Sequence, residues 1–133
     1  MGLLTHARDA AAVAPFWYFP AAAIELEPGM ALQLTDGLLQ MATGTDKPTH
    51  ICQYYSGGEA VEEGTIVAVT RVLDDVVFET TSSVDMSTVN IGDRVTIAAD
   101  GLRVTATTGG YAEVLYIEDT DAGGAVRVRF SAE

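Results

Sequence analysis

Two Asp-Gly dipeptides, each following a run of alternating side chains, constrain the fold of this chain more than any other feature. Asp36-Gly37 follows Leu32-Gln33-Leu34-Thr35, and Asp100-Gly101 follows a similar run that begins at Val95. Asp-Gly favours the tight turns of β-hairpins because these turns need positive φ, which glycine adopts freely and aspartate tolerates. Each site therefore predicts a β-hairpin.

Short runs of β-type composition continue along the chain after residue 24, and no segment has the apolar period of a helix. We expect strands at 31–35, 38–42, 49–54, 65–72, 76–80, 94–98, 102–107, 111–118 and 125–130. In the last of these, alternation places Val126, Val128 and Phe130 inward and two arginines outward. So many short strands predict an all-β fold, a compact β-barrel or β-sandwich with an extended N-terminal arm.

The two predicted hairpins resemble each other. Residues 29–43 and 92–107 share the pattern Gly-x-x-apolar-x-apolar, then Asp-Gly-Leu-x-x-x-Ala-Thr, with one additional residue, Ala98 or Ala99, in the second copy. A repeat of this kind predicts two related β units around one shared core, and the additional residue is a candidate β-bulge. Chance similarity between two amphipathic hairpins is the alternative.

Residues 1–23 differ from the rest of the chain, which we expect to form a single β-barrel or sandwich domain over residues 24–133. The candidate partner-binding residues of this arm are Pro15, Phe16, Trp17, Tyr18, Phe19 and Pro20. Successive side chains of an extended segment point to opposite sides, so one core cannot bury all four aromatic rings. One interpretation is an interface anchor that is dispensable for folding; the other is an edge strand covered by the protein's own loops.

Charge and hydropathy exclude several classes of partner. The chain has 7 Lys and Arg against 19 Asp and Glu, a net charge of −12, which repels phosphate backbones and anionic lipid surfaces. The longest apolar stretch, residues 10–24, is short for a membrane-spanning helix and contains two prolines. We expect no nucleic-acid or membrane partner, and a protein that is neither secreted nor membrane-embedded.

Residues with reactive side chains are few. His50 and Cys52 lie two apart on an expected strand and so share a face, but a nucleophile would also need an orienting group, and a metal ion would need two further ligands. The acidic clusters Glu59/Glu62/Glu63, Asp74/Asp75 and Glu118/Asp119/Asp121 lack the ligand spacing of a calcium loop, although calcium at one of them stays open. We expect no catalytic residues, no cofactor and no metal site.

The chain resembles the head decoration, or cement, proteins of tailed bacteriophages and prophages. The resemblance rests on the aromatic and proline-rich entry at 16–20, on Pro28-Gly29 leading to Asp36-Gly37-Leu38, and on Lys47-Pro48-Thr49. It continues through Val67 to Val72 and Phe78-Glu79-Thr80, and is strongest from Val89 to Thr108 and at Val126 to Phe130.

This resemblance implies a non-enzymatic β-rich protein on the outer surface of a virion, made in the bacterial cytoplasm, that stabilises a capsid by binding across major capsid protein subunits. It also implies a homo-oligomer, for which we favour a trimer. The first alternative is a carbohydrate- or receptor-binding module in which Trp17, or Tyr54 and Tyr55, form an exposed platform. The second is a small enzyme that uses His50 and Cys52.

Overall fold

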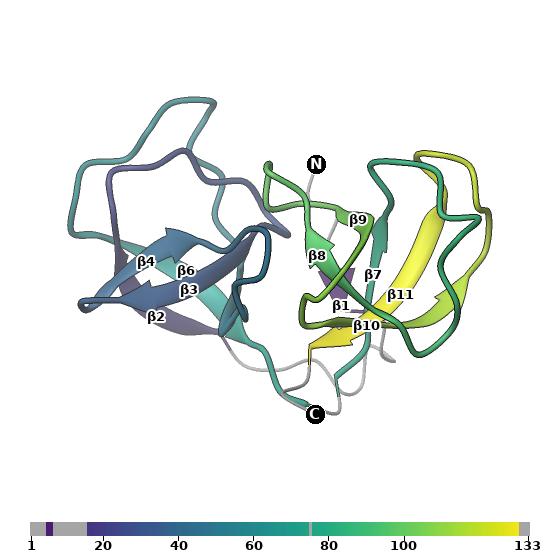
Figure 1. Ribbon diagram of the computed structural model, residues 1–133. Helices are drawn as coiled ribbons and strands as arrows, with labels where there is room; N and C mark the ends of the chain where they lie inside the picture. Colours follow the sequence, from purple (N-terminus) through teal and green to yellow (C-terminus); the bar gives the residue numbers. More distant parts are fainter. Residues whose placement is uncertain (1–4, 7–15, 75, 131–133) are drawn as a thin grey trace.

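The strands expected from the sequence are present, and the prediction of an all-β fold is confirmed. The computed structural model describes residues 5–6, 16–74 and 76–130, and these ranges contain no helix. Their strands, drawn in Figure 1, are β1 (Thr5–His6), β2 (Trp17–Ala21), β3 (Ala31–Thr35), β4 (Leu38–Met41), β5 (His50–Cys52), β6 (Thr65–Arg71), β7 (Phe78–Thr81), β8 (Arg94–Ile97), β9 (Val104–Thr108), β10 (Ala112–Ile117) and β11 (Ala125–Phe130).

The strands form two lobes that lie side by side (Figure 1). The first lobe is a closed barrel with the strand order β2-β4-β3-β5-β6. The second is a sheet with the order β1-β7-β11-β10-β8-β9. A parallel bridge between Ser82, which follows β7, and Val104 of β9 brings the two ends of this sheet together. Apart from β1, the second lobe therefore has the same circular strand order as the first.

Hydrogen bonding at the closure follows the same pattern in the two lobes. In the first lobe Ala21 pairs in parallel with Leu39, and the amide of Ala22 donates to the Leu39 carbonyl. In the second lobe Ser82 pairs in parallel with Val104, and the amide of Ser83 donates to the Val104 carbonyl. The repeat seen in two hairpins thus extends to all five strands of each unit.

The registers of the antiparallel pairs also coincide. β2 matches β7 and β6 matches β11, so Trp17 occupies the position of Phe78 and Arg71 the position of Phe130. The pairs that establish this are Trp17–Val69 and Phe19–Val67 in the first lobe, and Phe78–Val128 and Thr80–Val126 in the second. Likewise His50–Arg71 in the first lobe matches Ala112–Phe130 in the second.

Both Asp-Gly dipeptides lie at hairpin turns, as predicted, but the turns differ. Asp36 and Gly37 both have positive φ, 53° and 83°, and form a two-residue turn between β3 and β4. In the second hairpin only Gly101 has positive φ, and the Ala98 amide donates to the Arg103 carbonyl across a longer turn. The additional residue therefore lengthens the turn, whereas the register shift of this hairpin lies between Val95 and Ile97.

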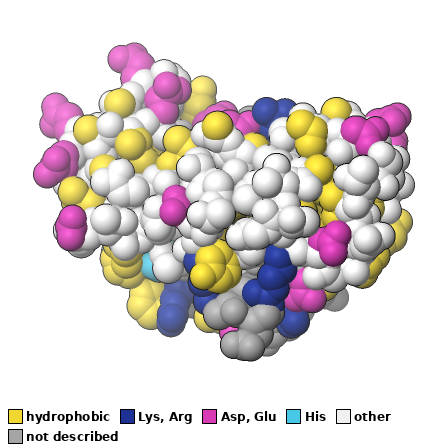
Figure 2. All heavy atoms as spheres, viewed as in Figure 1, with side chains coloured by type: hydrophobic (Ala, Val, Ile, Leu, Met, Phe, Trp, Pro, Cys, Tyr) yellow, Lys and Arg dark blue, Asp and Glu magenta, His cyan; other side chains and the backbone are white. Residues whose placement is uncertain are grey.

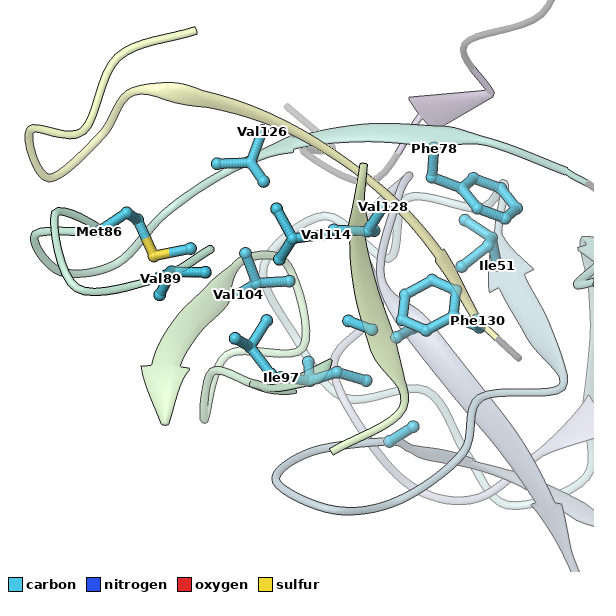
Figure 3. Packing of buried hydrophobic residues seen from close by; sticks show 14 of the residues in the cluster. Ile51, Phe78, Met86, Val89, Ile97, Val104, Val114, Val126, Val128 and Phe130 are labelled. Carbon is cyan, nitrogen blue, oxygen red and sulfur yellow. The ribbon is translucent and has the colours of Figure 1, made fainter. Parts of the chain in front are cut away.

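The buried hydrophobic residues form two clusters, so the expectation of one shared core is wrong. The larger cluster, part of which is shown in Figure 3, is centred on the second lobe and includes Phe78, Val114, Val128 and Phe130. The smaller cluster fills the first barrel with side chains such as Leu32 and Val67. A five-stranded barrel encloses its own interior, and two such barrels therefore need two cores.

Residues at the junction tie the two lobes together. Ala31, Ala42 and Ile51 belong to strands or turns of the first barrel but are buried in the larger cluster, and Leu102 of the second lobe is buried in the smaller one. Gly44 and Ile97 exchange two backbone hydrogen bonds of 2.8 and 3.0 Å. The number of independently folding domains in residues 24–133 stays a prediction, but each core uses side chains from both lobes.

The last part of the expected arm is a barrel strand. β2 pairs with β6 along its whole length and joins β4 at Ala21, which is fully buried. Residues 17–21 are therefore part of the folded barrel and do not extend from it. This pairing supports the edge-strand interpretation for residues 17–21. Pro15 and residues 7–14 lie outside the described part of the chain.

Candidate partner-binding site

The aromatic residues of β2 lie on two faces of the strand, as alternation requires. Trp17 and Phe19 pair with Val69 and Val67, whose side chains are buried in the first barrel, so both rings lie on its interior side. Tyr18 pairs with Ala68 on the outer side, where it is 64% exposed. Phe19 packs against the smaller core, whereas Trp17, at the open end of the barrel, remains 43% exposed.

Four side chains form a stacked group at this end of the barrel. The rings of Trp17 and Phe19 are nearly parallel with centroids 6.4 Å apart, and Phe19 contacts the His50 ring at 4.9 Å. The Arg71 guanidinium lies 5.3 Å from the centroid of the Trp17 ring, within the range of a cation–π interaction. This group holds the half-exposed indole in a fixed position.

The outer side of the same strands carries a second apolar surface. Ile66 of β6 is 58% exposed and pairs with Pro20, next to Tyr18 on this side. Phe16, which precedes β2, is 50% exposed. Aromatic and aliphatic side chains from two adjacent strands therefore present hydrophobic surface to solvent on the outer side of the first barrel. We call Phe16, Trp17, Tyr18 and Ile66, with Arg71, the aromatic end.

The structure brings together most of the predicted partner-binding residues but not as one surface. Phe16, Trp17 and Tyr18 are exposed, Phe19 and Pro20 are half-buried, and Pro15 lies outside the described residues. Sequence reasoning missed Arg71 and Ile66. Ile66 alternates with the buried Val67 and Val69, and Arg71 continues the side of these valines at the end of the strand, but only the pairing of β2 with β6 places both residues beside the aromatic cluster.

The distribution of charge distinguishes the lower edge of the molecule in the view of Figure 2. Hydrophobic and basic side chains lie together along this edge, where Figure 1 places β2, whereas most of the visible acidic side chains lie along the upper and outer rims. In the second lobe Arg127 pairs with Glu79 at 3.2 Å and Arg129 with Glu113 at 2.6 Å. The outward arginines of β11 thus neutralise carboxylates of the same chain.

His50 and Cys52 both point into the first barrel and are buried. Burial raises the pKa of the Cys52 thiol to about 11, despite a hydrogen bond with the backbone of Tyr54 that acts in the opposite direction. Burial and the neighbouring Arg71 charge lower the pKa of His50, whose Nδ1 lies 2.9 Å from the Thr49 hydroxyl. At neutral pH both groups are therefore uncharged, and the thiolate that a nucleophile or metal ligand needs is disfavoured.

Apart from Asp75, which lies outside the described residues, the residues of the predicted acidic clusters lie at turns and loops. Among the described residues, no three His, Cys, Asp or Glu side chains gather closely enough to hold a metal ion. Asp119, in one of these clusters, accepts a hydrogen bond from the backbone amide two residues later in the chain, which is how aspartate stabilises turns. Within residues 5–6, 16–74 and 76–130, no helix has the length and hydropathy to cross a membrane.

Comparison with known proteins identifies a structural relative but no sequence family. No family model matches the chain, and no curated protein does. Among solved structures, the chain is similar to the head fiber gp8.5 N base of bacteriophage phi29, with a TM-score of 0.54 and 17% sequence identity. The match covers 88% of this chain and 95% of that one. The likeness therefore spans nearly the whole of both chains, and at this identity it shows a shared fold.

Proposed function

We propose that this chain is a non-enzymatic structural protein of a bacteriophage head. In this proposal it lies on the outer surface of the capsid and stabilises the shell by binding across major capsid protein subunits through the aromatic end. The aromatic end carries the proposal, because it exposes three large rings and an isoleucine on a small acidic protein. The likeness of fold to a phage head fiber base supports the setting.

The physical basis of attachment is burial of these side chains. Each aromatic side chain that becomes fully covered contributes about 2–3 kcal/mol of transfer free energy before the cost of ordering. Trp17 is already fixed by Phe19 and Arg71, so little conformational entropy is lost when a partner covers it. A rigid anchor of this kind is typical of residues that dominate an interface.

We further propose that copies of the chain cluster as trimers on the shell, since a protein that stabilises subunit joints gains from repeated contacts at a symmetry point. Native mass spectrometry of the free protein and a map of the decorated particle test this proposal. Single, separate copies on the particle contradict it.

The direct test uses empty heads of the phage that encodes the chain, assembled without this protein. Purified protein is mixed with the heads, and the bound fraction is measured by sedimentation together with the resistance of the heads to heat. We expect saturable binding and more stable heads. If the heads sediment without the protein at micromolar concentration, the proposed function is wrong.

The carbohydrate-binding alternative is favoured by one observation, the 62% exposure of Tyr55 beside the partly exposed Tyr54. Trp17 is less suited to a sugar platform, because the Arg71 guanidinium lies over its ring. Binding to a glycan array distinguishes the two functions: binding that is lost in Tyr55→Ala but kept in Trp17→Ala supports the sugar-binding function.

A further inference from the structure

The two lobes differ at one edge, and the difference concerns the aromatic end. In the second lobe β1 pairs antiparallel with the first part of β7, with Thr5 opposite Glu79 and His6 opposite Phe78. β9 joins the same edge only beyond the end of β7, at Ser82. In the first lobe β4 joins the matching edge of β2 only at Ala21. Among the described residues, no strand occupies the edge of β2 from Trp17 to Phe19, where β1 would lie by analogy.

The backbone of Tyr18 faces this edge. The amide of Gln53 donates to the Ala68 carbonyl, so Ala68 directs its hydrogen-bonding groups toward β5. Tyr18 lies opposite Ala68, and in an antiparallel pair of this kind the residue directs its N–H and C=O away from its partner strand. Pro20, two residues further on, has no amide hydrogen to offer on this side. Tyr18 therefore presents one donor and one acceptor to an incoming strand.

Arg71 gives the incoming strand a chemical requirement. Its guanidinium lies over the Trp17 ring, and no carboxylate of the described residues forms an ion pair with it, whereas Arg103, Arg127 and Arg129 each have one. Trp17 is the counterpart of Phe78, which lies opposite His6 of β1. An acidic residue on a strand added to β2, at or next to the position opposite Trp17, would therefore lie near the guanidinium.

We propose that an extended segment of the capsid shell subunit adds antiparallel to the edge of β2 from Trp17 to Phe19, in the position that β1 occupies on β7, with a carboxylate facing Arg71. This inference rests on the proposed function and specifies how the aromatic end binds its partner. Backbone hydrogen bonds to Tyr18 supply the alignment, and Trp17, Tyr18 and Phe16 cover the side chains of the added strand. This edge of β2 is then paired in the assembled particle.

The first measurement is hydrogen exchange of the wild-type protein, free and bound to empty heads, resolved to single amides by mass spectrometry. The amide of Tyr18 should exchange rapidly in the free protein and at least about 100-fold more slowly on the heads, as for an amide that enters a sheet ladder. Bound protein whose Tyr18 amide still exchanges at the free rate overturns the inference but leaves the proposed function standing. Failure of the wild-type protein to bind heads overturns both.

Substitutions at Tyr18 separate its backbone from its side chain. Tyr18→Ala removes the ring but keeps the amide, whereas Tyr18→Pro removes both, and proline is tolerated where the lost amide faces away from the ladder. Tyr18→Pro should bind heads about tenfold more weakly than Tyr18→Ala. Equal binding by the two folded variants contradicts strand addition. If Tyr18→Pro does not fold, the exchange experiment on the wild-type protein decides.

The role of Arg71 has its own comparison. Arg71→Gln should bind heads about tenfold more weakly than the wild type, whereas Arg103→Gln, which breaks an ion pair within a turn, should bind as the wild type does. If Arg71→Gln binds as tightly as the wild type, the proposal that a carboxylate of the added strand faces Arg71 is wrong. The exchange experiment also tests for self-association. If the Tyr18 amide of the free protein exchanges more slowly at higher protein concentration, a second copy of the chain pairs with the edge of β2, and the proposal of a shell segment at this edge is wrong.

Discussion

At the scale of single residues, Trp17 connects the folded barrel to the proposed interface. Its ring packs on Phe19 and carries Arg71, yet nearly half of its surface is accessible. The matching residue of the second lobe, Phe78, is buried against Phe130 with ring centroids 5.8 Å apart. The same position therefore closes a core in one lobe and exposes a large aromatic surface in the other.

Trp17→Ala should leave the fold intact and weaken attachment to heads by roughly one to several kcal/mol, as removal of an aromatic anchor does. Sedimentation with heads measures attachment, and thermal unfolding of the free variant checks the fold. Tyr116→Ala removes an exposed ring from the other lobe and is the matched control. Full occupancy of the heads by Trp17→Ala would exclude the indole as an anchor.

Cys52 should be inert toward thiol reagents at pH 8, because burial raises its pKa to about 11 from an ordinary value of 9.0. The folded state disfavours the thiolate, so this group contributes stability that is present below pH 9 and is lost as the pH rises toward 11. Labelling of native and unfolded protein with a thiol-reactive dye, followed over pH, measures both effects. Rapid labelling of the native protein at pH 8 would show that the thiol is accessible and would support the alternative in which Cys52 is a nucleophile.

At the scale of elements, the turns of the two Asp-Gly hairpins differ in their tertiary contacts. The β3–β4 turn points into open space, whereas the second turn packs on the first lobe, with the Gly101 carbonyl accepting a hydrogen bond from the Ala31 amide. A Cβ added at Gly101 would lie 2.8 Å from Cγ of Met41, but one added at Gly37 would contact nothing within 4 Å. The two turns are similar in sequence, but only the second one forms contacts between the lobes.

Alanine substitution at the two turn glycines should separate backbone strain from packing. Gly37→Ala should lower the free energy of unfolding by about 1 kcal/mol, since its positive φ disfavours a side chain. Gly101→Ala should cost about 1–3 kcal/mol more, because Met41 must also move. Urea denaturation measures both variants. Equal losses of unfolding free energy in the two variants would show that the Met41 side chain moves aside at no energetic cost.

The pairing of β2 changes what an N-terminal truncation should do. Removal of residues 1–20 takes away most of a strand that closes the first barrel, so this variant should lose the cooperative unfolding transition of the protein. Removal of residues 1–15 takes away β1 but keeps β2, and this variant should remain folded. Circular dichroism and calorimetry of the two proteins make the comparison. A folded 21–133 fragment would restore the original expectation of a dispensable arm.

At the scale of the whole molecule, the two lobes exchange core residues. Ile51 is on a strand of the first barrel but is buried in the larger cluster beside Phe78 and Phe130 (Figure 3). Leu102 makes the reciprocal contribution to the smaller cluster. Because each core is incomplete without the other lobe, we expect the two lobes to fold as one cooperative unit.

Ile51→Ala should lower the free energy of unfolding by about 2–5 kcal/mol, as expected for a large buried side chain, and should destabilise both lobes equally. Trp17 fluorescence reports the first lobe, and the methyl resonances of Val128 report the second. Coincident transitions are expected for both the wild type and the variant. Separate transitions would mean that the lobes are independent domains.

The sequence by itself determined the strands, the two hairpins and the inward faces. Alternation in a strand fixes which residues share a side, so Val126, Val128 and Phe130 were placed correctly, and Asp-Gly fixed the turns because few other residues accept positive φ. The repeat was visible in the hairpins because alternation and Asp-Gly turns occur in both copies. These features depend on residues close together in the chain.

Tertiary structure decided how the strands close and which aromatic rings are exposed. Local alternation predicts that Trp17 and Tyr18 lie on opposite sides, but only pairing with β6 shows which side is the barrel interior. The same pairing puts Arg71 over the indole, and among the described residues no strand pairs with the other edge of β2 before Ala21. Register and closure are set by contacts between residues far apart in the chain, and such contacts leave no periodic signal in either segment alone.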